Sequence, residues 1–174
     1  WQGHDQVRDV RDADRGPREV AGSAFLDPLD LRQVDWRAGR AVWITTAPLR
    51  YRSARLGVTI LVPAEFITDL ASVPRLPLVW LATGGRGPRS AVIHDWAYQW
   101  GTWTREGGAS LPVPRRLADA IFHESLLADP ISGAGRARAW EMWAGVRLNV
   151  NGGIWGDTTR RAALRTHCSD FPTR

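Results

Sequence analysis

Lysine is absent from this chain of 174 residues, so arginine supplies all 23 of its basic side chains. The simplest explanation is the codon bias of a GC-rich genome, because alanine and glycine are also abundant. Cysteine is nearly absent too. The single Cys168 excludes an internal disulfide and gives no metal cluster by itself, so we expect a free thiol.

Long apolar runs are also missing, and none approaches the roughly 20 residues that a membrane-spanning helix needs. The stretch WQGHDQVRDVRDADRG at the start is polar and carries acidic groups, which is typical of neither a signal nor a transit peptide. The net charge is +5, but the arginines are spread from Arg8 to Arg174 with acidic residues among them. A nucleic acid is therefore not expected as the specific ligand.

Strand-forming residues are concentrated in the segment from about residue 41 to residue 68. The stretches AVWITTAPLRY and LGVTILVP are rich in β-branched and aromatic residues, and they predict a small antiparallel β-sheet or meander. Residues 1–40 are expected to form an N-terminal arm or extension, and residues 41–174 a single domain.

Three helices are predicted after these strands, at about residues 88–101, 114–128 and 136–148, so the fold class is α+β. Pro88 suits the first turn of the first helix, and Asp129–Pro130 ends the second. The segment TREGGASLPVP between them predicts a loop. Most of the ten tryptophans are expected in or beside the core.

Ionisable residues occupy positions on two predicted helices that should face the protein interior. His94 and Tyr98 fall on one stripe of the first helix, and Asp119 lies within an apolar pattern on the second. A carboxylate that binds one imidazole nitrogen leaves the other nitrogen as a base, and the neighbouring Asp95 is suited to a hard cation. The alternative is a satisfied His–Asp pair in the core. His123 is a third possible ligand or a surface residue.

The pattern HDxxY followed by AD..F resembles the helix pair of calcium-dependent phospholipases that cleave the sn-2 ester. The resemblance covers about 45 residues. It implies that His94 is the base, that Asp95 binds calcium, and that Tyr98 and Asp119 hold the His94 ring.

A longer resemblance covers roughly residues 41–150. The stretches ILVPAEFITDLASVPR, AVIHDWAY, RRLADAIF and WAGVR resemble the phage- and prophage-associated family known as domain of unknown function 1353. The resemblance implies a phage-encoded protein and adds four polar positions to the candidate site, as substrate-binding residues or as a structural network: Asp69, Ser72, Arg75 and Arg116.

Two functions are therefore expected from the sequence. The first is a virion-associated protein, such as a tail or head–tail accessory component, which contacts other phage structural proteins and lies in the virion or in the bacterial cytoplasm during assembly. The alternative is a metal-dependent hydrolase of membrane lipid or of an envelope ester or amide that uses the His94–Asp119 pair. Its cofactor is then a divalent cation, with calcium favoured over zinc.

Overall fold

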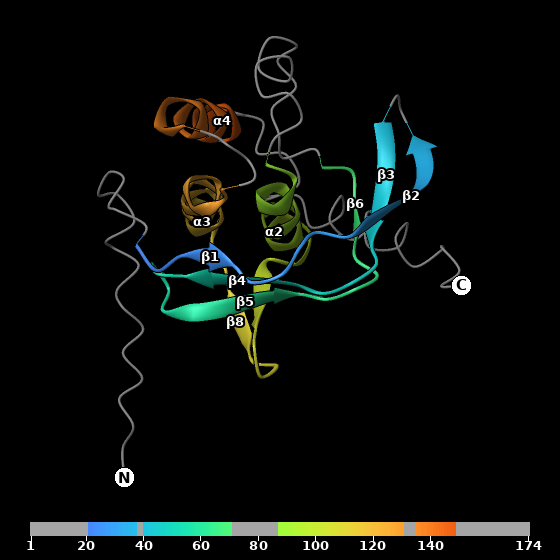
Figure 1. Ribbon diagram of the computed structural model, residues 1–174, viewed down its shortest axis with the longest axis horizontal. Coiled ribbons are helices and arrows are strands. Elements are labelled where there is room, and N and C mark those ends of the chain that lie inside the picture. The colour runs from blue at the N-terminus through green and yellow to red at the C-terminus, as the bar shows by residue number, and fades with distance from the viewer. Residues whose placement is uncertain (1–20, 38–39, 71–86, 131–134, 149–174) are drawn as a thin grey trace.

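The computed structural model describes residues 21–37, 40–70, 87–130 and 135–148. Its strands form two antiparallel sheets. Three helices follow the first six described strands, and a further hairpin lies between the first two helices. The α+β class predicted from the sequence is therefore confirmed (Figure 1). In the described part of the chain, no helix combines the length and the apolar character that a membrane span requires.

The larger sheet has five strands in the order β1-β4-β5-β7-β8. Its central hairpin shows why these residues form strands, since Leu49, Tyr51 and Ser53 alternate with two arginines and point into the interior. The bounds of its strands are Ala24–Phe25 (β1), Leu49–Ser53 (β4), Val58–Val62 (β5), Thr102–Arg105 (β7) and Ser110–Pro112 (β8).

The smaller sheet has the order β2-β3-β6 and lies to one side of the helices (Figure 1). Its strands are Leu31–Arg37 (β2), Arg40–Thr45 (β3) and Ile67–Thr68 (β6), and β2 carries an irregularity between Gln33 and Asp35. Strands β1 and β2 lie within the segment 1–40, where no strand was predicted.

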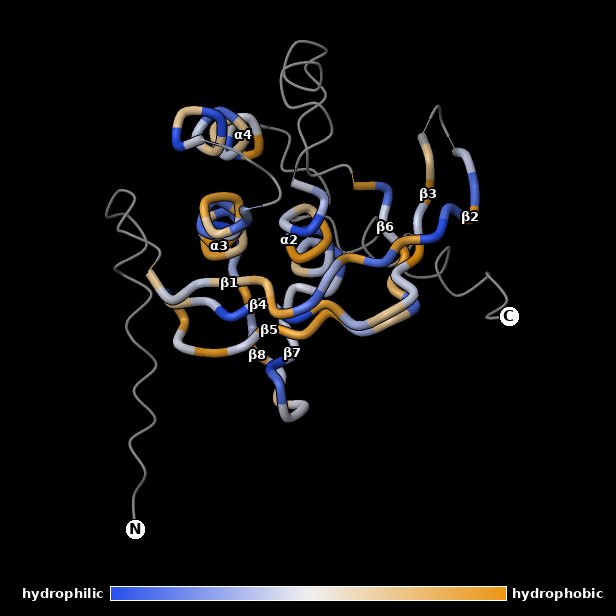
Figure 2. The backbone as a smooth tube through the Cα atoms, viewed as in Figure 1, coloured by the Kyte–Doolittle hydropathy of each residue, from blue (hydrophilic) through white to orange (hydrophobic). Residues whose placement is uncertain are grey.

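The three helices are Pro88–Trp100 (α2), Arg115–Ala128 (α3) and Arg136–Leu148 (α4), within one residue of the predicted ranges. Helices α2 and α3 lie side by side over the five-stranded sheet, and α4 packs on α3 (Figure 1). Figure 2 shows hydrophobic segments on α2, on α3 and on the strands beneath them. The main core fills this layer, with Tyr51, Ile93, Trp103 and Ile121 among its fully buried members.

The local structure differs from the sequence prediction in two places. The stretch AVWITTAPLRY forms two strands, because Thr46–Pro48 separates β3 in the small sheet from β4 in the large one. The segment expected to be a loop before α3 contains the end of β7, the turn of the β7–β8 hairpin and all of β8. Gly107 and Gly108 adopt positive φ angles of 98° and 89° at its turn, and the glycines that suggested a loop therefore serve a tight connection.

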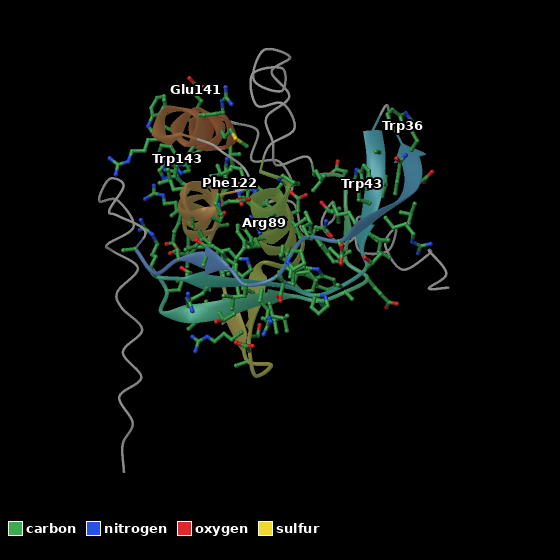
Figure 3. All side chains as sticks on the ribbon, in the orientation of Figure 1. Trp36, Trp43, Arg89, Phe122, Glu141 and Trp143 are labelled. Carbon is green, nitrogen blue, oxygen red and sulfur yellow. The ribbon has the colours of Figure 1, made fainter. Side chains whose placement is uncertain are left out.

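Of the seven described tryptophans, four are buried or half-buried, as expected for most of them, and three are exposed. Trp103 is fully buried and donates a hydrogen bond from Nε1 to the Ile93 carbonyl oxygen at 3.1 Å. Trp36, Trp100 and Trp140 are 65%, 41% and 57% exposed. Figure 3 shows Trp36 on the small sheet, far from Phe122 between the helices. An exposed tryptophan is available for contact with another molecule.

Candidate functional site

His94 and Tyr98 on α2 meet Asp119 on α3, as the sequence predicts. His94 Nε2 lies 3.0 Å from Asp119 Oδ1, and the Tyr98 hydroxyl donates a hydrogen bond to the same oxygen at 2.8 Å. The start of α2 also contacts the end of α3, because Arg89 forms an ion pair with Asp129. These contacts show that the two helices run antiparallel, which brings residues 25 positions apart in the sequence into one site.

The site is a closed, largely aromatic environment. The His94 side chain is 1% exposed and Asp119 is fully buried. The ring of His94 packs against Tyr98 with a centroid separation of 4.1 Å and against Phe122 with one of 4.8 Å. These two rings and the bond to Asp119 fix the orientation of the imidazole.

Electrostatics make His94 neutral and Asp119 ionised. Burial lowers the pKa of His94 below 6.5, and the hydrogen bond to Asp119 opposes this effect without reversing it. Burial alone raises the pKa of Asp119, but the hydrogen bonds from His94 and Tyr98 and the Arg115 charge bring it below 3.8. Since an ionised carboxylate only accepts, Nε2 carries the proton, and the imidazole lone pair is on Nδ1.

Two arginines face the second oxygen of Asp119. Arg115 Nε lies 3.8 Å from Oδ2, and Arg147 Nη1 lies 3.6 Å from the same oxygen. Both distances are too long for a hydrogen bond. Oδ2 is buried and accepts no hydrogen bond from the described residues. Arg115 instead donates to the Tyr98 hydroxyl and to the Val146 carbonyl, both at 3.3 Å. The end of α4 is thereby linked to the site.

Asp95 points away from this group, toward β6. The Thr68 hydroxyl donates a hydrogen bond to Asp95 Oδ2 at 2.5 Å, and Gln99, one turn further along α2, donates to the Ile67 carbonyl at 3.2 Å. The adjacent His94 and Asp95 therefore belong to two faces of α2, one against α3 and the other against the small sheet.

A metal site was predicted at Asp95. Within the ranges that the structure describes, no group of three or more His, Cys, Asp or Glu residues is arranged to hold a metal ion. Metal binding at Asp95 stays a prediction. The ring of His123 packs against Trp143 with a centroid separation of 5.7 Å.

The remaining predicted site residues are not brought together by the described structure. Asp69 is partly buried directly after β6, and Thr68 caps the turn there by accepting a hydrogen bond from the Leu70 backbone N–H. Arg116 is exposed. Ser72 and Arg75 lie outside the described residues.

Arg115 and Arg147 are site residues that the sequence analysis missed. Arg115 precedes Asp119 by four residues on the same helix, a spacing that places both on one face, so this signal was available. Arg147 comes from α4, and nothing in the local sequence indicates its approach to Asp119.

A second buried polar cluster lies between α3 and the five-stranded sheet. Glu124 is 4% exposed and its Oε1 accepts hydrogen bonds from the Ser23 and Tyr51 hydroxyl groups at 2.8 and 3.0 Å. Arg55 Nε lies 3.7 Å from Oε2. This cluster attaches the chain beside β1 to α3, and the Arg55 charge faces the second oxygen of Glu124 from beyond hydrogen-bond distance.

Comparison with known proteins gives one finding. A family model described as "Protein of unknown function (DUF1353)" matches residues 43–146, which is more than half of the chain. The match contains both helices of the His94–Asp119 site and most of α4. No curated protein and no solved structure shows significant similarity to the chain.

Proposed function

The chain belongs to this family of proteins of unknown function, and we propose that it is a hydrolase of a membrane-lipid or envelope ester or amide, with His94 as general base. The observation that supports the proposal most is the shared oxygen of Asp119, which binds both His94 and Tyr98. This is the arrangement that the phospholipase resemblance implies for the same three residues.

The chemistry follows from the protonation states. Nδ1 of neutral His94 takes a proton from a water molecule while the water oxygen attacks the substrate carbonyl carbon. The imidazolium formed in this step is stabilised by the ionised Asp119, which stays unprotonated. The bond to the leaving group then breaks, and the proton passes from Nδ1 to the leaving oxygen or nitrogen. Water and ester yield acid and alcohol, with His94 returned to its neutral state.

Burial sets a condition on this reaction. A water molecule and a carbonyl group must reach His94, whose side chain is 1% exposed. Catalysis therefore includes an opening of the protein around the His94 ring, and closing it again excludes bulk water from the reacting groups.

The test is hydrolysis by the wild type and by His94→Gln, on phospholipid vesicles and on isolated bacterial envelopes, with and without calcium or zinc. We expect the substitution to lower the rate by about 10²–10⁴-fold, the usual contribution of a general base. His123→Gln is the matched control, because His123 also lies partly buried on α3 but its ring packs against Trp143. Equal rates for His94→Gln and the wild type, or no hydrolysis of any of these substrates by the wild type, would refute the proposal.

A second function, association with the virion, is supported by a separate observation. Trp36 is 65% exposed on β2, which is an edge strand of the small sheet, and such a side chain fits a contact with another phage structural protein. The resemblance of TDLASVPR and its neighbouring stretches to phage-associated proteins agrees with this role. Here the His94–Asp119 pair fixes the packing of α2 on α3.

Sedimentation of phage particles tests this second function. Wild-type protein is expected to co-sediment with particles, and Trp36→Ser is expected to weaken this association without changing the melting temperature. A protein that remains monomeric and never co-sediments with particles contradicts virion association.

A further inference from the structure

Helix α4 lies on the far side of α3 from the five-stranded sheet, so one of its faces is at the protein surface (Figure 1). Its buried face packs on α3 through three residues: Ala139, Met142 and Val146. By helical periodicity the opposite face carries Ala137, Trp140 and Ala144. Trp140 is 57% exposed, Ala137 is exposed and Ala144 is half-buried. These three residues, called here the outer face of α4, present one large aromatic ring between two small side chains.

The first turn of α4, beside this outer face, is positively charged. Arg136 is exposed and Arg138 is half-buried, and this turn contains no acidic residue. The positive end of the helix dipole lies at the same place, and a cation there destabilises a helix. The stability of α4 therefore does not explain the two arginines.

The carboxylates of the neighbouring helix do not cancel this charge at the surface. Helix α3 has two acidic residues, and both lie in the interior, since Asp119 is fully buried and Glu124 is 4% exposed. The single acidic residue of α4 is Glu141, which is exposed. The surface of α4 beside Trp140 thus carries the two arginines of its first turn against one carboxylate, and its net charge is positive.

These charges favour one kind of occupant for the outer face. A second copy of the chain would bring the same positive surface and a net charge of +5, so two copies repel each other. A nucleic acid duplex would neutralise the arginines but would offer Trp140 no apolar layer. An anionic lipid surface matches both features, because it has phosphate groups outside and acyl chains directly beneath them.

We propose that the outer face of α4 docks on the surface of an anionic phospholipid bilayer. Trp140 enters the boundary between headgroups and acyl chains, where tryptophan is enriched because its ring is apolar and its Nε1–H is polar. Arg136 and Arg138 lie against the lipid phosphates. Docking requires no catalytic role for His94, so the failure of this proposal and the failure of the proposed hydrolysis are distinguishable.

Flotation of the full chain with vesicles tests the docking face. One set of vesicles is phosphatidylcholine alone, and the other is equimolar phosphatidylcholine and phosphatidylglycerol. We expect the anionic vesicles to bind at least about tenfold more tightly, and their binding to weaken as salt is added. Trp140→Ser should weaken it about tenfold, which corresponds to roughly 55 Å² of apolar surface withdrawn from water, and Arg136→Gln about fivefold.

Two variants on the small sheet are the matched controls. Trp36→Ser and Arg32→Gln make the same chemical changes at exposed residues of β2, and each should change vesicle binding less than about twofold. Figure 3 shows Trp36 and Glu141 of α4 on opposite sides of the view. Losses in these controls as large as those of the α4 variants would overturn the assignment to α4.

Melting temperatures and two conservative variants separate lost docking from lost structure. Surface substitutions have small effects on stability, so Trp140→Ser and Arg136→Gln should melt close to the wild type. Arg136→Lys keeps the charge and Trp140→Phe keeps an apolar ring, and both should bind better than the variants that remove these properties. Equal affinity for neutral and anionic vesicles, no binding to either, or unchanged binding by Trp140→Ser overturns the proposal. Dimers that Trp140→Ser dissociates, or single-stranded DNA bound through Arg136, overturn it as well if vesicles do not bind.

Discussion

Removing the hydroxyl group of Tyr98 tests how the polar site contributes to stability. Tyr98→Phe deletes one oxygen atom and retains the ring that packs on His94 at 4.1 Å. The lost contacts are the 2.8 Å hydrogen bond to Asp119 and the longer one, at 3.3 Å, that the hydroxyl accepts from Arg115. His94 still binds the buried carboxylate of Asp119.

The expected cost follows from the charge of the acceptor. A hydrogen bond to a charged group contributes about 1.5–3 kcal/mol, compared with about 1 kcal/mol for a neutral one. We therefore expect Tyr98→Phe to lower the free energy of unfolding by about 2 kcal/mol, which corresponds to a fall of about 4–8 °C in the melting temperature of a chain of this length.

Urea unfolding of four proteins measures this effect: the wild type, Tyr98→Phe, Asp119→Asn and the double variant. Because the amide introduced by Asp119→Asn is neutral, the cost of removing the hydroxyl should fall by about half in that background. A loss below about 0.5 kcal/mol for Tyr98→Phe, or the same loss in both backgrounds, would show that the hydroxyl does not act through an ionised Asp119.

Two further predictions concern pH and backbone geometry. Burial lowers the pKa of His94 in the folded state, so the unfolded chain binds more protons below pH 6.5, and stability is expected to fall as the pH decreases from about 7 to about 5. Thermal melts should show a weaker dependence of the melting temperature on pH for His94→Gln than for the wild type, and an unchanged dependence contradicts the burial argument. His123→Gln should remove a further part of the pH dependence, because the pKa of His123 is also lowered by burial. Gly87 is the N-cap of α2 and has a φ of 92°, and a Cβ added there lies 2.9 Å from Leu126 Cδ2. Gly87→Ala therefore combines a strained backbone with a steric overlap. Gly57 also has a positive φ, of 67°, but a Cβ added there meets open space. Gly57→Ala should therefore lower the free energy of unfolding by about 1–3 kcal/mol, from backbone strain alone, and Gly87→Ala should lower it further in the same urea assay. Equal losses for the two variants would refute the steric argument.

The helices and the His94–Asp119 contact could be predicted from the sequence because their signals are local. Pro88 lies in the first turn of α2, and Asp129 ends α3 before Pro130, so the helix bounds follow from residues at the boundaries. The connection between these helices is long enough to let them run antiparallel. Once the helices are antiparallel, the two inward-facing polar positions meet.

The parts that could not be predicted depend on contacts between distant segments. Strand β1 has two residues, Ala24 and Phe25, and exists because they pair with Arg52 and Tyr51 of β4. Two residues carry no periodic signal. Arg147 reaches Asp119 only because α4 packs on α3 in one particular orientation. The approach of Arg147 to Asp119 therefore becomes visible only in the folded protein.

The most direct test of the account is whether His94 and Asp119 act as one unit in hydrolysis. The rates of His94→Gln, Asp119→Asn and the double variant are measured on a substrate that the wild type cleaves. Residues that act as a unit have non-additive effects, so we predict that the double variant is no slower than the slower single variant. Losses that multiply in the double variant would contradict the pairing of His94 and Asp119 as a single base.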